Sequence, residues 1–264
     1  MVVLITGVSS GFGLETAKAL LNRGHIVYGT VRREVVPVDG MHYLHVDVRD
    51  NAQVIQAVDT VIREQGHIDV LVNNAGMGIG GPIEFASEED VNTQMDINFM
   101  GLVRCVKAVL PHMRRQGSGK IVAFSSIGGL MGLPFQGYYS ASKFAIEGFC
   151  EALRLEVRPD NIKVVVIEPG DFHTAFTSKR KKESDPLADA AYPSYAESMR
   201  SIEKDETTGL LPEYLAIRLA GIVEKKNPSY NYIIATFVQR LSVTLKHILP
   251  SKVFSRILGS YYKL

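Results

Sequence analysis

Two absences limit what this chain can be: it has few cysteines and no long apolar run. Its two cysteines, Cys105 and Cys150, lie far apart and in no metal-ligand spacing. This predicts two small core thiols in a reducing compartment, and no metal site. No stretch approaches the roughly 18 apolar residues of a membrane span. Residues 1–6 have neither the basic segment nor the cleavage site of a signal peptide. We therefore expect a soluble, cytoplasmic protein.

The chain also lacks an excess of charge of either sign. Its 29 Lys and Arg residues balance 28 Asp and Glu residues, which leaves a net charge of +1. Such a surface has no global field that would attract a nucleic acid, and no nucleic-acid motif is present. We expect a small-molecule substrate. The 264 residues fit one large α/β domain or two small ones.

The N-terminal segment has the pattern of a strand, a glycine turn and a helix. The apolar run at residues 2–5 leads into Thr6-Gly7-x-x-x-Gly11-x-Gly13, and residues 14–21 have helical spacing. Glycines let the backbone approach a pyrophosphate, whose charge is favoured at a helix N-terminus. The pattern therefore indicates a dinucleotide site, with a plain tight turn as the alternative.

Further apolar strands alternate with amphipathic helices along the chain. Strands are predicted at 26–31, 43–46, 68–72, 120–124 and 163–167, and helices at 51–65, 87–116 (bent or ended at Pro111) and 144–157. This alternation predicts an α/β fold: a single Rossmann-type doubly wound parallel β-sheet with helices on both faces. Ligands of such sheets bind at the carboxyl ends of the strands, so the polar residues there should converge on one site.

The end of the second strand bears on the choice of cofactor. An acid there would accept a hydrogen bond from the ribose 2′-hydroxyl of NAD, whereas arginine suits the 2′-phosphate of NADP. The chain has Val31 followed by Arg32 and Arg33. NADP(H) is therefore favoured over NAD(H), with a solvated basic loop as the alternative.

Tyr139 and Lys143 place a phenol and an ammonium one helical turn apart. An ammonium about 4–5 Å away favours the phenolate by about 3–4 kcal/mol, which lowers the phenol pKa by roughly 2–3. Ser126, at the end of a predicted strand, can steady charge on a substrate oxygen. A chance pair on a solvated helix is the alternative. Tyr138 and Ser125 are rival residues, but only Tyr139 has a lysine four positions on.

In combination, these motifs resemble the short-chain dehydrogenase/reductase family, over residues 6–174. The resemblance implies a catalytic set of Asn98, Ser126, Tyr139 and Lys143. In that set the tyrosine is the general acid/base, and the lysine holds the nicotinamide ribose and lowers the tyrosine pKa. The serine orients the substrate oxygen, and the asparagine holds a water in a proton relay.

The same resemblance implies a cofactor site. Ser9, with Arg32 or Arg33, would meet the 2′-phosphate, and Thr174 would lie near the carboxamide. The implied cofactor-binding residues are Gly7, Ser9, Ser10, Gly11, Phe12, Gly13, Arg32, Arg33, Asp47, Val48, Asn74, Ala75, Gly76, Tyr139, Lys143, Pro169, Gly170, Phe172 and Thr174.

Within the family, residues 128–135 and 170–176 look most like the branch of retinol dehydrogenases and 17β-hydroxysteroid dehydrogenases, which act on lipophilic substrates. Candidate pocket-wall residues, which could equally be loop packing, are Met77, Ile79, Leu130, Met131, Leu133, Phe135, Phe172 and Phe176.

We expect one domain over residues 1–264: a cofactor-binding and catalytic core at 1–175, then a lid, substrate-side helices and C-terminal helices at 176–264. Residues 177–193 are polar and predict a solvated loop or a mobile lid. Helices are predicted at 195–203 and 212–225, and an edge strand at 230–235. Amphipathic helices at 237–249 and 253–258 would pack on the sheet, or contact the substrate, a membrane surface or another subunit. The family often forms homodimers or homotetramers.

The sequence thus predicts an NADP(H)-dependent oxidoreductase. It would interconvert a carbonyl and a primary or secondary alcohol on a steroid- or retinoid-like substrate, with Tyr139 as general acid/base. Nucleotide-sugar epimerases or dehydratases share the Tyr/Lys chemistry, but they are usually longer and have another glycine spacing. A non-catalytic NADP-binding regulator would have no need of an intact set of Ser126, Tyr139 and Lys143.

Overall fold

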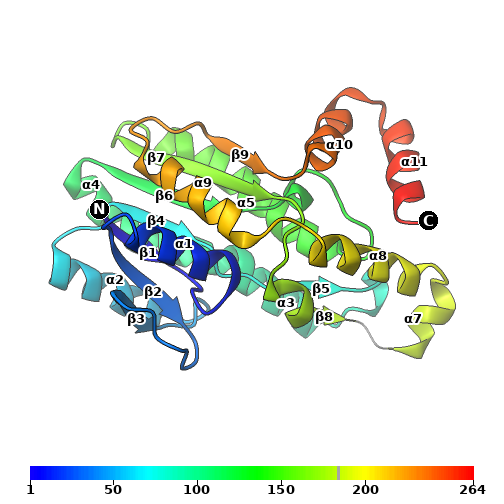
Figure 1. The fold of residues 1–264 in the computed structure, drawn as a ribbon, viewed down its shortest axis with the longest axis horizontal. Coiled ribbons are helices and arrows are strands. Elements are labelled where there is room, and N and C mark those ends of the chain that lie inside the picture. The colour runs from blue at the N-terminus through cyan, green and yellow to red at the C-terminus, as the bar shows by residue number, and fades with distance from the viewer. Residues whose placement is uncertain (183–184) are drawn as a thin grey trace.

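A seven-stranded parallel sheet forms the centre of the computed structural model, which describes residues 1–182 and 185–264 (Figure 1). Its strand order is β3-β2-β1-β4-β6-β7-β9, and every neighbouring pair is parallel. The strands are β1 (Val2–Ile5), β2 (Ile26–Val31), β3 (Met41–His45), β4 (Val70–Asn73), β6 (Gly119–Phe124), β7 (Ile162–Pro169) and β9 (Asn231–Ile234).

Helices cover both faces of this sheet, as the alternating pattern predicted. One face carries α1 (Gly11–Leu21) and α9 (Pro212–Glu224), and the other carries α2 (Asn51–Gln65), α4 (Gly101–Gln116) and α5 (Gly137–Glu156). Each face has its own apolar cluster, because strands covered on both sides are apolar throughout. Strand order reverses between β1 and β4, where doubly wound sheets open a crevice for ligands.

The helix predicted at residues 87–116 is present, but it is not α-helical throughout. It consists of α3 (Glu88–Met95), a π turn at Asp96–Met100, and α4. The wider turn changes the direction in which successive side chains point, and it carries Asn98, which is buried. Pro111 lies inside α4 and does not end it; the helix ends at Gly117, whose φ of 69° favours glycine.

Most of the remaining elements gather beyond the carboxyl ends of the strands, toward the right of Figure 1. The predicted loop at 177–193 instead contains the end of α6, strand β8 and α7, while its residues 183 and 184 lie outside the described part. The elements that gather beyond the strand ends are β5 (Ile79–Gly80), α6 (Ala175–Lys179), β8 (Lys181–Lys182), α7 (Pro186–Ala191), α8 (Tyr195–Thr207), α10 (Phe237–Ile248) and α11 (Ser251–Tyr261). Within the described residues, no helix combines the length and apolar character needed to cross a bilayer.

Candidate active site

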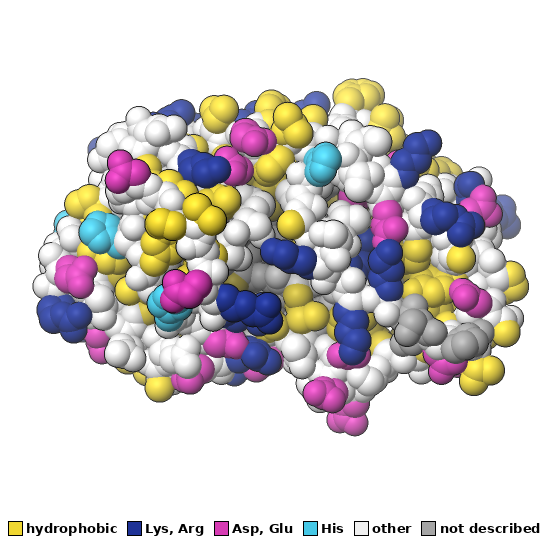
Figure 2. All heavy atoms as spheres, turned by 60° about the horizontal axis from the view of Figure 1, so that its bottom comes forward, with side chains coloured by type: hydrophobic (Ala, Val, Ile, Leu, Met, Phe, Trp, Pro, Cys, Tyr) yellow, Lys and Arg dark blue, Asp and Glu magenta, His cyan; other side chains and the backbone are white. Residues whose placement is uncertain are grey.

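A cavity of about 990 Å³ runs along the carboxyl ends of the strands. Figure 2 shows a hollow in this face of the molecule, with Lys and Arg side chains gathered at its rim. We call its two sides the strand-end wall, made by the loops after β1, β2, β4, β6 and β7, and the helical wall, made by α8, α10 and α11. The predicted residues that line it are Gly7, Ser9, Ser10, Gly11, Phe12, Arg32, Arg33, Asp47, Val48, Asn74, Ala75, Gly76, Ser126, Tyr139, Lys143, Pro169, Gly170, Phe172 and Thr174.

The glycine turn after β1 is shaped to receive an anion. Gly7 and Gly11 have φ of 75° and 59°, a region that glycine adopts without strain. Ser10 precedes α1, but no side chain caps this helix end, so its first backbone N–H groups remain free beside the cavity. Free donors at a helix N-terminus fit the pyrophosphate of a dinucleotide.

Gly13 does not line the cavity, contrary to its predicted role in contacting the cofactor. A Cβ there would lie 2.3 Å from the Gly7 carbonyl oxygen and 2.4 Å from Nδ2 of Asn74. The residue is therefore required for packing α1 against the turn. Asn74 braces the same turn, since its Nδ2 donates to the carbonyls of Thr6 and Gly7 at 2.9 Å each.

Arginines dominate the end of the cavity beside β2 and β3. Arg32 and Arg33 are exposed and line it together with Glu34, whose carboxylate is 94% exposed and lies 3.5 Å from Nε2 of His45. Arg49 also lines the cavity and donates to the Asp47 carboxylate at distances down to 2.6 Å, which holds the pKa of Asp47 below its usual value. Sequence reasoning missed Arg49, although it stands only two residues after Asp47.

A further basic group reaches the glycine turn from α6. Nζ of Lys179 donates to Oγ of Ser10 at 3.0 Å, so this side chain spans the cavity. The basic run at 179–182 was predicted to be a loop or a lid, with no role for its individual members. The members diverge in the structure: Lys179 faces the cavity, while Arg180 is buried against Glu206.

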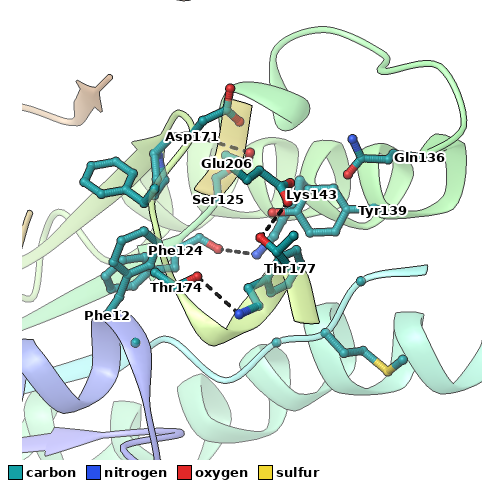
Figure 3. Close-up of a pocket in the computed structure, with 18 of the residues that line it drawn as sticks. Phe12, Phe124, Ser125, Gln136, Tyr139, Lys143, Asp171, Thr174, Thr177 and Glu206 are labelled. Atoms are coloured by element: carbon teal, nitrogen blue, oxygen red, sulfur yellow. Dashed lines mark hydrogen bonds between the residues drawn. The ribbon is translucent and has the colours of Figure 1, made fainter. Parts of the chain in front are cut away.

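Tyr139 and Lys143 meet on one side of α5, as their spacing predicted. Nζ of Lys143 donates to the Phe124 carbonyl at 2.8 Å and lies 5.6 Å from the centroid of the Tyr139 ring (Figure 3). Burial lowers the pKa of Lys143 to about 8. Ser126 stands beside the phenol, and their hydrogen bond lowers the phenol pKa.

The expected lowering of the Tyr139 pKa by Lys143 is wrong for this structure. Burial raises the pKa of Tyr139 to about 12, and the carboxylates of Glu206 and Asp171 add to the rise. The physical reason is the position of the ammonium, which lies over the ring and bonds a backbone carbonyl. In this state the phenol is an acid that stays protonated at neutral pH.

The structure also separates Tyr139 from its rival. The hydroxyl of Tyr138 donates to the Ile83 carbonyl at 3.2 Å, and Tyr138 does not line the cavity. Ser125 and Ser126 both line it, but the Ser126 hydroxyl is the one bonded to the phenol. The residues that meet at the cavity are therefore those that the sequence favoured.

Asn98 stands behind the cavity and does not line it. Its Nδ2 donates to the Met77 carbonyl at 2.9 Å and to Oγ of Ser142 at 3.0 Å, and its Oδ1 accepts from the Met77 N–H at 2.8 Å. These bonds occupy the side chain and fix the loop after β4 to α5. Asn98 is thus a positioning residue in this structure, and its role in holding a water stays a prediction.

The predicted apolar wall is only partly correct. Met77, Met131, Leu133, Phe172 and Phe176 line the cavity. Three predicted members do not: Ile79 lies in β5, Leu130 packs beneath α10 and α11, and Phe135 packs against two tyrosines.

The sequence left open whether the C-terminal helices pack on the sheet or contact substrate, a membrane or another subunit. In the structure they line the cavity, because α1, α9 and α2, α4, α5 already cover the sheet. Their amphipathic pattern was the available signal. The apolar and aromatic residues they contribute are Val238, Leu241, Leu245, Phe254, Ile257, Leu258, Tyr261 and Tyr262.

Comparison with known proteins agrees with this geometry. The family model for short chain dehydrogenases matches residues 1–185. The chain belongs to the short-chain dehydrogenase/reductase family. It is an oxidoreductase of that family, whose related members are dehydrogenases and reductases acting on alcohols and carbonyls.

Two relatives differ in how much of the chain they match. A 3-ketodihydrosphingosine reductase of Bacteroides thetaiotaomicron is 47% identical over 268 residues, covering 100% of this chain and 98% of its own. The human 17-beta-hydroxysteroid dehydrogenase type 1 is 42% identical over 194 residues, covering 67% of this chain and 58% of its own. The chain thus spans little more than half of the steroid enzyme.

Solved structures share the fold. A short-chain dehydrogenase from Streptomyces avermitilis has a TM-score of 0.81 at 29% identity, covering 99% of this chain and 96% of its own. A serine dehydrogenase complexed with NADP+ has a TM-score of 0.75 at 27% identity, covering 90% and 96%. The family's cofactor is a nicotinamide dinucleotide, and the free N–H groups at α1 fit it.

Proposed function

We propose that this protein is an NADP(H)-dependent reductase of a long-chain ketone of the 3-ketodihydrosphingosine type. The observation that carries the proposal is the continuity of one cavity from the Ser126 and Tyr139 hydroxyls to the apolar residues of α10 and α11. A long-chain ketone has a carbonyl group that the two hydroxyls can bind and an alkyl chain that the apolar residues of the helices can cover. The relative matched along the whole chain bears this substrate in its name, while the steroid relative matches 67% of the chain.

In the proposed mechanism, this chain's residues hold the ketone and deliver a proton. A bound nicotinamide supplies the hydride. The Ser126 hydroxyl orients the carbonyl oxygen, and Tyr139 donates its phenolic proton to that oxygen as charge develops there. The raised pKa of Tyr139, about 12, suits an acid, because the phenol carries its proton across the physiological range. Lys143 keeps its place through Phe124 and would hold the ribose.

The preference for NADP(H) is supported by the charges at the adenosine end. Arg32 and Arg33 line the cavity where β2 ends, and that strand ends in Val31, without a carboxylate. Guanidinium groups bind phosphate by charge and by paired hydrogen bonds. We further propose one domain and a cytoplasmic location and, as the family resemblance implies, a homodimer or homotetramer.

The proposal is tested by measuring NADPH consumption at 340 nm with purified protein. Four substrates would be compared: 3-ketodihydrosphingosine, estrone, all-trans retinal and cyclohexanone. We expect kcat/KM for the sphingoid ketone to exceed that for the others by at least about tenfold, since each buried CH₂ contributes about 0.8 kcal/mol. A higher kcat/KM for estrone or retinal would contradict the assignment, as would a preference for NADH.

A further inference from the structure

A group of carboxylates stands in the cavity next to the proton-transfer residues. Asp171 follows β7, and Asp205 and Glu206 lie near the end of α8; all three line the cavity. Figure 3 shows Glu206 next to Tyr139, with Asp171 beyond it. Both carboxylates act on the phenol, since they contribute to the raised pKa of Tyr139. Negative charge therefore lies close to the carbonyl that the phenol would serve.

Neutral donors hold each carboxylate in place. Nε2 of Gln239 donates to Asp171 at 2.5 Å, the Tyr261 hydroxyl donates to Asp205 at 2.6 Å, and the Thr177 hydroxyl donates to Glu206 at 2.7 Å. The backbone of Asp171 is fixed as well, because its carbonyl accepts from the N–H of Leu210. These three contacts orient the carboxylates and add no positive charge of their own.

The positive charge beside this group is too small to balance it. Arg180 forms an ion pair with Glu206, and it is the cation that opposes the raised pKa of Asp171. Burial raises the pKa of Asp171 to about 7, and Glu206 and Asp205 add to the rise. One guanidinium thus faces three carboxylates, and a cationic group in the cavity would relieve their repulsion.

A second feature, Gln136, points independently to a polar ligand here. Its side chain is 5% exposed and lines the cavity, and no hydrogen bond of its amide is found among the described residues. Figure 3 shows the amide directed toward Glu206 and Tyr139. The preceding Phe135 has a φ of 57°, a strained conformation for a bulky residue. The Gln136 amide is therefore open to the cavity, where a polar group of a ligand can form hydrogen bonds with it.

We propose that Asp171, supported by Asp205 and Glu206, binds an ammonium group on the carbon next to the substrate ketone. The ketone oxygen then meets Ser126 and Tyr139, a neighbouring hydroxyl meets the free amide of Gln136, and the alkyl chain follows α10 and α11. The ligand class is a long-chain 2-amino ketone or the 2-amino alcohol formed from it. This inference rests on the proposed function and adds the group that sets its selectivity.

The first test compares two ketones on wild type and on Asp171→Asn. The substrates are 3-ketodihydrosphingosine and 1-hydroxyoctadecan-3-one, which has the same chain and hydroxyl but no amine. The variant keeps an oxygen for Gln239 and removes the charge. We expect the ratio of kcat/KM, amino ketone over neutral ketone, to fall about 30-fold, which is about 2 kcal/mol at 1.4 kcal/mol per tenfold.

The matched control is Glu197→Gln, which removes one charge from α8 at an exposed position outside the cavity. It should leave the ratio within about twofold of wild type. NADPH binding by fluorescence verifies that each variant is folded. An unchanged ratio in a folded Asp171→Asn protein overturns the inference, while good turnover of both ketones would leave the proposed function standing.

The second test needs no turnover and covers the case in which the Asp171 variant fails to fold. Calorimetry on the NADPH-loaded wild-type protein measures binding of dodecylamine and of dodecanol below their aggregation limits. We expect the amine to bind at least about tenfold more tightly. Such a preference without ketone reduction would refute the proposed function and keep the ammonium site; equal affinities would refute the site.

Discussion

The two walls of the cavity are built from different parts of the polypeptide. The strand-end wall presents backbone groups and short side chains held at fixed spacing, such as the free N–H groups at the start of α1 and the turn braced by Asn74. The helical wall presents long side chains from α8, α10 and α11. A backbone site binds what every member of a family shares, whereas a wall of side chains can change its ligand by substitution.

Solvent exposure differs between the walls as well. Val238, Leu241 and Ile257 line the cavity, yet their exposed fractions are 68%, 43% and 49%. By contrast, Ile127 and Phe172, apolar residues that line the cavity after β6 and β7, are 7% and 4% exposed. The helical wall is therefore open to the outside, where an alkyl chain could enter. Each of the following predictions tests whether changes in one wall leave the function of the other intact.

The largest effect is expected from Tyr139→Phe in the strand-end wall. Loss of the acid should lower kcat by about 10³-fold on every ketone, while NADPH binding measured by fluorescence persists. Tyr138→Phe is the matched control, since that phenol bonds the Ile83 carbonyl outside the cavity; its kcat should stay within about twofold. Comparable rates for Tyr139→Phe and wild type would remove the phenol from the mechanism.

The next largest effect is expected from the double variant Arg32→Ala, Arg33→Ala. Loss of the phosphate partners should weaken NADPH binding by about 30- to 100-fold and NADH binding by less than about threefold. The control removes the same charge from exposed positions elsewhere, by Arg63→Ala with Arg158→Ala. Titration of both nucleotides measures the difference. If NADH weakened as much as NADPH, the phosphate assignment would be wrong.

A smaller, substrate-specific effect is expected from Leu241→Asn in the helical wall. Loss of apolar contact should raise KM about tenfold for an 18-carbon ketone and leave a six-carbon ketone unaffected. Ile248→Asn lies on the same helix, is 71% exposed and does not line the cavity, so its KM should not change. Steady-state kinetics with both ketones measures these changes in KM. Equal effects on the 18-carbon and six-carbon ketones would argue against the proposed path of the alkyl chain along α10 and α11.

The smallest effect is a shift in pH dependence. Burial lowers the pKa of Lys143 to about 8, so the ammonium is present below pH 8 and is lost as pH rises through that value. We expect kcat/KM for NADPH to fall above about pH 8, while Tyr139 stays protonated. Glu147 raises the Lys143 pKa, so Glu147→Gln should move the fall to lower pH. A profile that is flat to pH 9 would contradict this.

Local patterns predicted much of the strand-end wall. The bounds of β1, β2 and α2 match the predicted ranges, because an apolar run or an amphipathic period ended by a cap is a property of neighbouring residues. Tyr139 and Lys143 face the same side for the same reason. Gly13 was wrongly assigned to cofactor contact. Spacing alone cannot distinguish a glycine that leaves room for a ligand from one that lets a helix pack closely against a turn.

Local sequence patterns could not predict the contacts between segments that lie far apart in the chain. The ammonium of Lys143 has Phe124 as its partner, and the Tyr139 phenol takes its high pKa from burial and from carboxylates on other elements. Each of these depends on the position of a residue far away in the chain. Sequence reasoning therefore predicted that Tyr139 and Lys143 lie together at the cavity, but it gave the phenol pKa the wrong direction.

The sequence by itself determined the fold, the glycine turn and the Ser126–Tyr139–Lys143 set, because strand order and local spacing bring these to one edge of a parallel sheet. Only the tertiary structure decided that α10 and α11 line the cavity and that Asp171 reaches it. The position of a helix beyond the sheet depends on which surfaces the other helices have already covered. What the cavity binds beside the cofactor is therefore decided by packing.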